Sequence, residues 1–400
     1  MALSRGTIRQ HGGVMSFRHS IAKEKGGGMF VDHGSAFVEG HVSFMSCSTF
    51  ESFGATNALA GGGLAMHHGN VTLRDAEVEV QNCTASEGGG ISFDQSNLTQ
   101  DGGRLQISKC EAVVKGGGVS MDGGFIWLTS GTLQFEMCKS AVGGGLSVRE
   151  GQLNQEDGNM KFLNCNSRLG GGVGLERGRI RQHGGSILFS GCTADHNGGG
   201  MLSRTGQTLF KGNVSFTHCR AVEHEGGGMA LLHSSLTVED AEVHIHECTA
   251  LRGGGIAMIH SNASQRGGLL HVDHCAASWQ GGGIFLRSGN LSLISGSMKV
   301  ENAVVLNTKK EKRKQGGGGL WVEWGQVDQY GGDFSFLHCS SFFGGGIALL
   351  SSKIHQRDGS MSFHDCIAER YGGGMLIKHS KVFFTAHVSF SSCRASGAKG

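Results

Sequence analysis

A run of three glycines recurs along this chain and sets the period of the other sequence features. Ten of the twelve intervals between successive runs are 27 or 28 residues, and the other two are 35 and 36. A fixed period of about 20–50 residues is typical of solenoids, propellers and other repeat arrays. The runs end at Gly28, Gly63, Gly90, Gly118, Gly145, Gly172, Gly200, Gly228, Gly255, Gly283, Gly319, Gly346 and Gly374.

Cysteine follows the same period, at one position in each repeat. Each cysteine lies three residues after an apolar residue, usually phenylalanine, and two repeats carry Ser20 or Ala303 instead. No C-x2-C pair or Cys₂His₂ spacing occurs, so the pattern does not indicate a zinc site. We predict an inward ladder of small, buried and mostly unpaired thiols with a structural role. Its members are Cys47, Cys83, Cys110, Cys138, Cys165, Cys192, Cys219, Cys248, Cys275, Cys339, Cys366 and Cys393.

Within a repeat, apolar residues alternate with a period of two, which is typical of β-strands. Ile91 and Phe93 follow one triplet, Leu98 comes next, and Leu105 and Ile107 precede the cysteine. No segment has the apolar spacing that a helix of ten residues needs. The sequence therefore predicts an all-β parallel β-helix of about fourteen coils of 27–28 residues, with three short strands per coil.

The coil geometry explains the glycines. Stacked coils place equivalent residues about 4.8 Å apart, so each triplet becomes part of a ladder at one corner of the solenoid. Glycine adopts positive φ without penalty and has no side chain to clash with the neighbouring coil. A phosphate-binding loop is a poor alternative, because no triplet is followed by Lys-Ser/Thr or begins a helical pattern.

Composition and chain organisation exclude several functions. The chain has 71 glycines, no proline and a net charge of +2 in 400 residues, so no strong field attracts nucleic acid. No apolar run reaches the roughly 18 residues of a membrane-spanning helix, and the first residues lack the apolar core of a secretory signal. We expect residues 1–400 to form one continuous array, part of a longer chain, with insertions at 48–60 and 304–315.

Two alternatives need weighing. A polysaccharide lyase or glycosidase with this fold needs acidic residues that converge on one groove. Asp75, Asp157, Asp240 and Asp358 share one position, but no two of them lie in neighbouring repeats. A leucine-rich-repeat solenoid can also have a 27-residue period, yet here the triplet replaces its helix. Five histidines lie five residues after a triplet, and we expect an exposed, variable turn there: His33, His68, His233, His260 and His379.

The repeats resemble those of the chlamydial polymorphic outer membrane proteins. The triplet followed by an apolar residue corresponds to the family's GGAI, and F-x-x-C corresponds to its F-x-x-N. This resemblance implies a right-handed parallel β-helix of pectin-lyase-like shape at a cell surface. We therefore expect a non-catalytic structural or adhesin-like scaffold, displayed or secreted, and not an enzyme. Surface glycans or proteins are the expected partners, with no nucleic acid, cofactor, metal or catalytic residue.

Overall fold

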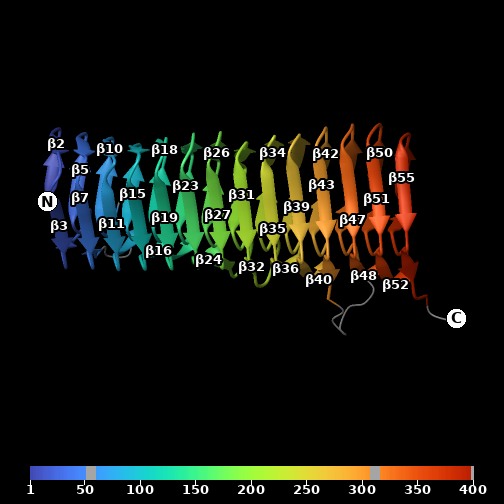
Figure 1. Ribbon diagram of the computed structural model, residues 1–400. Coiled ribbons are helices and arrows are strands. Elements are labelled where there is room, and N and C mark those ends of the chain that lie inside the picture. The colour runs from blue at the N-terminus through green and yellow to red at the C-terminus, as the bar shows by residue number, and fades with distance from the viewer. Residues whose placement is uncertain (51–59, 307–315, 398–400) are drawn as a thin grey trace. The chain divides into compact units, whose positions relative to one another are not determined.

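The computed structural model describes residues 1–50, 60–306 and 316–397. Over these ranges the chain is an all-β parallel β-helix of fourteen coils, as predicted, with four strands per coil and no helix (Figure 1). None of its described elements is a helix that could cross a membrane. Most of the insertions at 48–60 and 304–315 lies outside the described residues.

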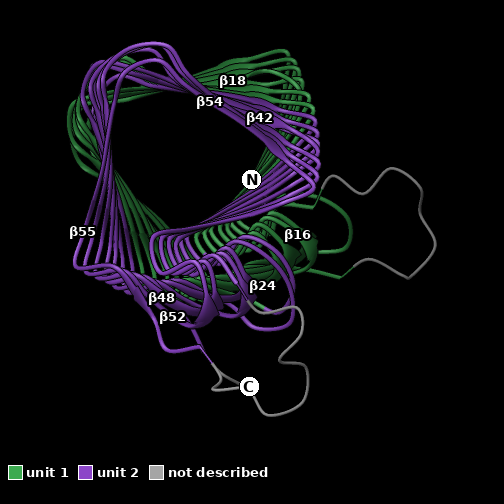
Figure 2. Ribbon diagram, turned by 90° about the vertical axis from the view of Figure 1, so that its right-hand side faces the viewer, with its two compact units in different colours: residues 1–194, 200–202 green, residues 195–199, 203–400 purple. Residues whose placement is uncertain are grey.

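The chain divides into two compact units, coloured separately in Figure 2. Unit 1 contains residues 1–194 and 200–202, and unit 2 contains residues 195–199 and 203–400. Within each unit, equivalent strands of successive coils pair in parallel and form four sheets. We number the sheets by their order within a coil, beginning after the glycine triplet.

The first sheet follows the triplet, and the first and third residues of most of its strands are buried. In unit 1 its strands are β1 (Ala2–Ser4), β5 (Met29–Asp32), β9 (Leu64–His67), β13 (Ile91–Asp94), β17 (Val119–Asp122), β21 (Leu146–Arg149) and β25 (Val173–Glu176). The residues of β29 (Met201–Arg204) are divided between the units. In unit 2 the strands are β33 (Met229–Leu232), β37 (Ile256–Ile259), β41 (Ile284–Arg287), β45 (Leu320–Glu323), β49 (Ile347–Leu350) and β53 (Met375–Lys378).

The second sheet follows the first after a gap of two residues in each of the described coils. In unit 1 its strands are β2 (Thr7–Gln10), β6 (Ser35–Val38), β10 (Asn70–Arg74), β14 (Asn97–Asp101), β18 (Phe125–Leu128), β22 (Gln152–Gln155) and β26 (Arg179–Gln182). In unit 2 they are β30 (Gln207–Phe210), β34 (Ser235–Glu239), β38 (Asn262–Arg266), β42 (Asn290–Leu293), β46 (Gln326–Gln329), β50 (Lys353–Gln356) and β54 (Lys381–Phe384).

The third sheet precedes the cysteine position and carries the phenylalanines of the repeat. In unit 1 its strands are β3 (Val14–Arg18), β7 (His41–Met45), β11 (Glu77–Gln81), β15 (Arg104–Ser108), β19 (Thr132–Glu136), β23 (Asn159–Leu163) and β27 (Ser186–Ser190). In unit 2 they are β31 (Asn213–Thr217), β35 (Glu242–His246), β39 (Leu269–Asp273), β43 (Ser297–Glu301), β47 (Asp333–Leu337), β51 (Ser360–His364) and β55 (His387–Ser391).

The fourth sheet, which the sequence did not predict, lies between the cysteine and the next triplet. Its strands are short, and their register shifts in several pairs. In unit 1 they are β4 (Ile21–Ala22), β8 (Ser48–Thr49), β12 (Thr84–Glu87), β16 (Glu111–Lys115), β20 (Lys139–Val142), β24 (Asn166–Leu169) and β28 (Thr193–Ala194). In unit 2 they are β32 (Arg220–Ala221), β36 (Thr249–Arg252), β40 (Ala276–Gln280), β44 (Val304–Val305), β48 (Ser340–Phe343), β52 (Ile367–Tyr371) and β56 (Arg394–Ala395).

The glycine corner has the tight backbone packing that the repeat predicted. A Cβ on Gly144, the middle glycine of its triplet, would lie 2.4 Å from the carbonyl oxygen of Gly171 in the next coil. Gly143 has a φ of +64°, and the amide of Gly145 donates to the carbonyl of Gly172 at 3.0 Å. Larger residues are therefore excluded by the neighbouring coil, as well as by the turn itself.

The interior of each unit is built from ladders of like side chains. In unit 1, Phe162 lies between Phe135 and Phe189, with ring centroids 4.9 and 4.8 Å apart and nearly parallel planes. Buried glutamines close the corner after the second sheet. The side-chain amide of Gln155 donates to the carbonyls of Gly158 at 2.9 Å and Ser186 at 3.1 Å, so it links two coils.

Candidate functional site

The cysteine ladder occupies the inner side of the corner after the third sheet. Eleven of the twelve cysteines are buried and belong to no disulfide among the described residues, whereas Cys393 is partly exposed. The Cys110 thiol donates to the carbonyl of Ser108 at 3.4 Å and to that of Val80, in the preceding coil, at 3.7 Å. Burial raises the pKa of the Cys110 thiol well above its ordinary value. Inaccessible thiols react slowly with external reagents and metal ions, and the structural role of the ladder stays a prediction.

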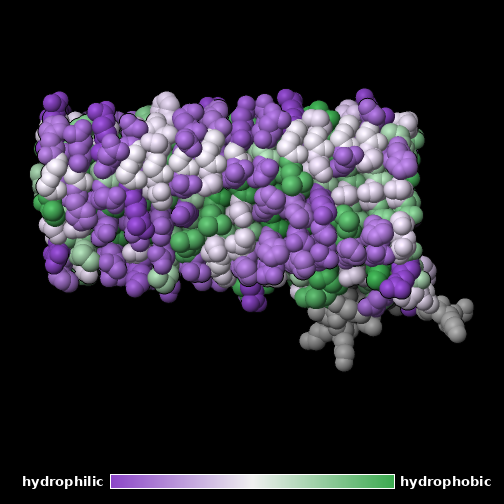
Figure 3. Space-filling model, viewed as in Figure 1, coloured by the Kyte–Doolittle hydropathy of each residue, from purple (hydrophilic) through white to green (hydrophobic). Residues whose placement is uncertain are grey.

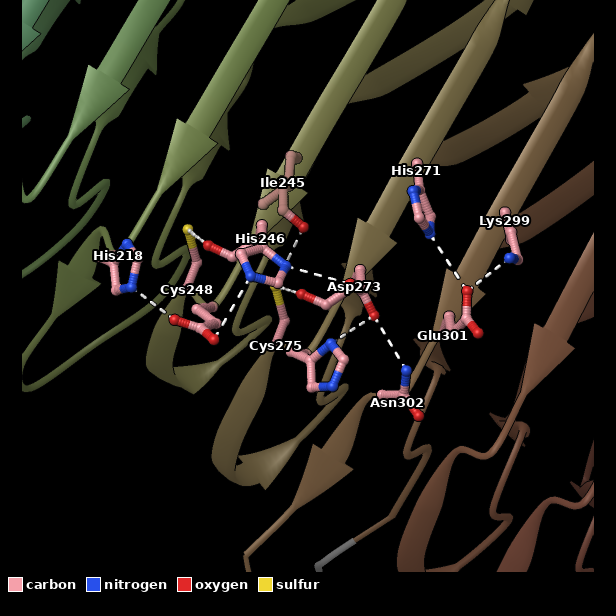
Figure 4. Close-up of polar contacts among 12 residues, drawn as sticks. His218, Ile245, His246, Cys248, His271, Asp273, Cys275, Lys299, Glu301 and Asn302 are labelled. Carbon is pink, nitrogen blue, oxygen red and sulfur yellow. Dashed lines mark hydrogen bonds and ion pairs between the residues drawn. The ribbon is translucent and has the colours of Figure 1, made fainter.

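The outer side of the same corner carries a cluster of histidines and acids in unit 2 (Figure 4). Asp273 ends β39, His274 follows it with a φ of +49°, and His246 ends β35 in register with Asp273. The two carboxylate oxygens of Asp273 lie 2.7 Å from His274 Nδ1 and 3.1 Å from His246 Nδ1. We call these three residues the Asp273 triad.

Further polar groups hold the Asp273 triad in place. The carboxylate of Glu247 lies 3.4 Å from His246 Nε2 and 2.5 Å from His218 Nε2. The side-chain amide of Asn302 donates to Asp273 at 3.1 Å. Burial alone would raise the pKa of Asp273, but hydrogen bonds with His274, Asn302 and His246 hold that pKa below its usual value. Asp273 is therefore an ionised carboxylate at neutral pH.

At the same corner of the next coil, acidic Glu301 forms ion pairs with neighbouring side chains. Glu301 ends β43, and its Oε2 lies 2.5 Å from Lys299 Nζ and 3.5 Å from His271 Nε2. The Lys299 ammonium holds the pKa of Glu301 below its usual value, and burial lowers the pKa of His271. The carboxylate of Glu301 is thus already neutralised by a fixed cation, in contrast to that of Asp273.

A second triad in unit 1 has the same plan at a different corner. Asp32 ends β5, His33 follows it with a φ of +50°, and His67 lies in register with Asp32 on β9. Asp32 Oδ1 lies 2.8 Å from His67 Nδ1 and 3.0 Å from His33 Nδ1. Hydrogen bonds with His67 and His33 lower the pKa of Asp32. The far nitrogen, His67 Nε2, lies 3.5 Å from the carboxylate of Asp94. We call Asp32, His33 and His67 the Asp32 triad.

Both triads present ligand types that suit transition metals. Imidazole nitrogens with one carboxylate oxygen are a common donor set for zinc and its neighbours. Within each triad, one ligand atom from each residue lies within 4.8 Å of the others. The sequence analysis considered only the five histidines that lie five residues after a glycine triplet. Of these, only His33 belongs to a triad, so the other triad residues were not considered as metal ligands. The arrangement is chemically able to hold a divalent ion.

A charged cluster in unit 1 joins residues that sequence reasoning did not bring together. Lys115, nearly buried, lies 2.6 Å from Asp122 and 3.2 Å from Glu87, and Arg149 lies 2.7 Å from Asp122. Burial raises the pKa of Glu87, against the opposing effect of Lys115. Each acid faces a cation, so the cluster is arranged as an ion-pair network, not as a pair of acids flanking a sugar bond.

An apolar groove with polar edges lies on the outer side of unit 2. Its cavity has a volume of about 490 Å³, and Trp321, Phe343 and Tyr371 contribute aromatic rings to its lining. The rings of Phe343 and Tyr371 are nearly parallel, with centroids 6.0 Å apart. Gln280 and Glu323 also line it. The face shown in Figure 3 carries hydrophilic residues with apolar ones scattered among them.

Alignment of the repeats on their cysteines would have revealed the Asp273 triad. The segments "HIHEC" (244–248) and "HVDHC" (271–275) place histidines and acids at the same two positions of consecutive coils. Since those positions are one strand spacing apart in a stacked solenoid, their side chains must be neighbours. The basic residues of the second insertion, such as Lys312, lie outside the described residues.

Comparisons with known proteins give no functional assignment. The chain matches no family model, no curated protein and no solved structure. The resemblance to chlamydial surface repeats therefore depends on the repeat motifs alone.

Proposed function

We propose that this chain is a non-catalytic structural scaffold with an adhesin-like role, displayed at a cell surface or secreted. Its inward positions repeat the same residue types from coil to coil, as the stack of Phe135, Phe162 and Phe189 illustrates. Its outward positions differ: Glu79 of β11 is followed in register by Gln106 of β15. A constant interior with a variable surface suits a protein that presents binding groups on a rigid support.

The observation that carries the adhesin-like role is the aromatic groove of unit 2. Sugar rings pack their apolar faces on aromatic side chains and hydrogen-bond to polar groups at the edges. Tyr371 is 58% exposed, so its ring is accessible. The indole Nε1 of Trp321 is buried, with no hydrogen-bond partner among the described residues. That nitrogen is closed to solvent, so the accessible ring of Tyr371 and the polar groups at the groove edge make a surface glycan the favoured partner.

Binding to an array of glycans and extracellular-matrix proteins tests this function. We expect the wild-type chain to bind a subset of glycans and Tyr371→Ala to lose at least tenfold in affinity. Tyr330→Ala is the matched control, because Tyr330 is an exposed tyrosine that lies outside the groove lining and packs against Arg357. If neither glycans nor proteins bind, or if both variants bind like the wild type, the adhesin-like role at this groove is wrong.

A carbohydrate-active enzyme is the alternative, and the charged cluster around Lys115 is where it would act. Incubation of the chain with acidic and neutral polysaccharides tests for release of unsaturated or reducing ends. We expect no release above a heat-denatured control. Cleavage that is lost in Lys115→Met and retained in Tyr371→Ala would replace the scaffold proposal with an enzyme.

A further inference from the structure

We propose that the Asp273 triad and the Asp32 triad each bind one divalent transition-metal ion, with zinc as the representative. The ligands are two imidazole Nδ1 atoms and one carboxylate in each case. Water completes the coordination shell, because the side chains are open to solvent on one side. This inference does not depend on the glycan-binding groove and adds a separate property to the scaffold.

The geometry of the Asp273 triad suits a small ion. Both imidazoles turn Nδ1 toward the same carboxylate, at 2.7 and 3.1 Å. Ligand atoms around tetrahedral zinc lie about 3.4 Å apart, as follows from metal–ligand distances near 2.1 Å. Small side-chain rotations that move the ligand atoms by up to about 1 Å would therefore admit an ion. The exposed side-chain fractions, 40% for His246 and 54% for His274, leave an entry path.

The backbone that carries these ligands is held by the coil register. His246 pairs with Asp273 across β35 and β39, and the amide of Glu247 donates to the carbonyl of Asp273 at 3.1 Å. The amide of His274 donates in turn to the carbonyl of Glu301 at 3.1 Å. Because the three ligands come from two adjacent strands with fixed spacing, binding would order little more than side chains.

An independent observation is that the same arrangement occurs twice, at different corners. In each triad an aspartate ends a strand, a histidine follows it at positive φ, and a second histidine lies in register on a neighbouring strand. In each triad a further carboxylate faces the far nitrogen of that second histidine, Glu247 for His246 and Asp94 for His67. Carboxylates at this position orient metal-bound histidines and raise their basicity.

The pair His233 and His260 shows what the triads add. These two rings lie in successive coils and stack with centroids 4.8 Å apart and planes 9° from parallel. Neither histidine belongs to a group of three or more metal-ligating side chains among the residues that the structure describes. Two imidazoles without a carboxylate offer only two neutral ligand atoms, compared with three ligand atoms and a negative charge in each triad. His233 and His260 therefore serve as the matched control.

Zinc titration of the 1–400 chain by isothermal calorimetry tests the proposal. We expect the stoichiometry to fall by one equivalent in Asp273→Asn combined with His274→Ala. It should fall by one equivalent in Asp32→Asn combined with His33→Ala, and not at all in His233→Ala combined with His260→Ala. Glu247→Gln should keep the stoichiometry and weaken zinc binding at the Asp273 triad about tenfold, as loss of an orienting carboxylate usually does.

Cobalt(II) spectra distinguish the triads from the cysteines. Binding at the triads gives visible d–d bands without a thiolate charge-transfer band, because the ligands are nitrogen and oxygen. A strong thiolate band would place the metal at cysteine and overturn the proposal. Unchanged stoichiometry in both triad variants, or a loss as large in the His233 and His260 control, would overturn it equally.

Discussion

Replacement of Phe162 by alanine should destabilise the coils around it strongly. The Phe162 side chain is 1% exposed and stacks on Phe135 and on Phe189, with centroids 4.9 and 4.8 Å away. Removing a buried phenylalanine typically costs about 3–5 kcal/mol, and each lost aromatic pair accounts for about 0.5–1.5 kcal/mol. Since the backbone above and below is fixed by the coil register, the cavity cannot collapse, so we expect a value near the upper end.

Urea unfolding measures the size of this loss, and hydrogen exchange measures its extent. Solenoid stability comes from interfaces between neighbouring repeats. Exchange should therefore accelerate in the coils of Phe135, Phe162 and Phe189 and stay slow around Phe363 of unit 2. Lys161→Ala, at the adjacent outward position of β23, is the control and should change stability by less than about 0.5 kcal/mol.

Two results would refute this reasoning. A loss below about 1 kcal/mol in Phe162→Ala would show that the ring does not fill the core. Equal acceleration of exchange along the whole chain would show that the coils unfold together and not as a set of neighbouring interfaces.

Two further predictions concern the glycine corner and the thiols. In urea unfolding, Gly144→Ala should lower the free energy of unfolding by more than about 3 kcal/mol, and by more than Gly145→Ala does. The new Cβ of Gly144 meets only backbone, at 2.4–2.8 Å, whereas that of Gly145 first meets the Phe162 ring, at 2.8 Å. Equal losses in the two variants would contradict this. Burial raises the pKa of Cys110 in the folded chain. The stability that the protonated Cys110 thiol contributes is therefore complete below the pKa of an unfolded thiol, near 8.5. Above that pH the contribution falls by about 1.4 kcal/mol per pH unit. The pH slope of unfolding free energy above pH 9 should thus be shallower by about that amount in Cys110→Ala, and an unchanged slope would show that Cys110 ionises in the fold.

Periodic features of the sequence were sufficient to predict the first three sheets, the glycine corner and the inward position of the cysteines. Each of these features repeats a residue type at a fixed position, so its physical cause is the same in every coil. Phe93 and Ile107, for example, were expected to point inward and are buried.

The fourth sheet and the triads were not predictable in the same way. Strands such as β12 and β16 differ in length and shift register, so no alternation of apolar residues marks them. The triads depend on side chains from neighbouring coils, such as His246 and Asp273, that are 27 residues apart in sequence. Only alignment of whole coils brings such residues together, and the direction of each imidazole is then decided by local hydrogen bonds.

Thiol labelling of the native 1–400 chain, read by peptide mass spectrometry, tests the stacked-coil account most directly. The account predicts that Cys393 alone is labelled quickly and that the other eleven cysteines, which are buried, react only after unfolding. Labelling of all twelve in denaturant provides the reference for complete reaction. Rapid labelling of several of the eleven in the native chain would place the ladder on the outside and contradict the register of the coils.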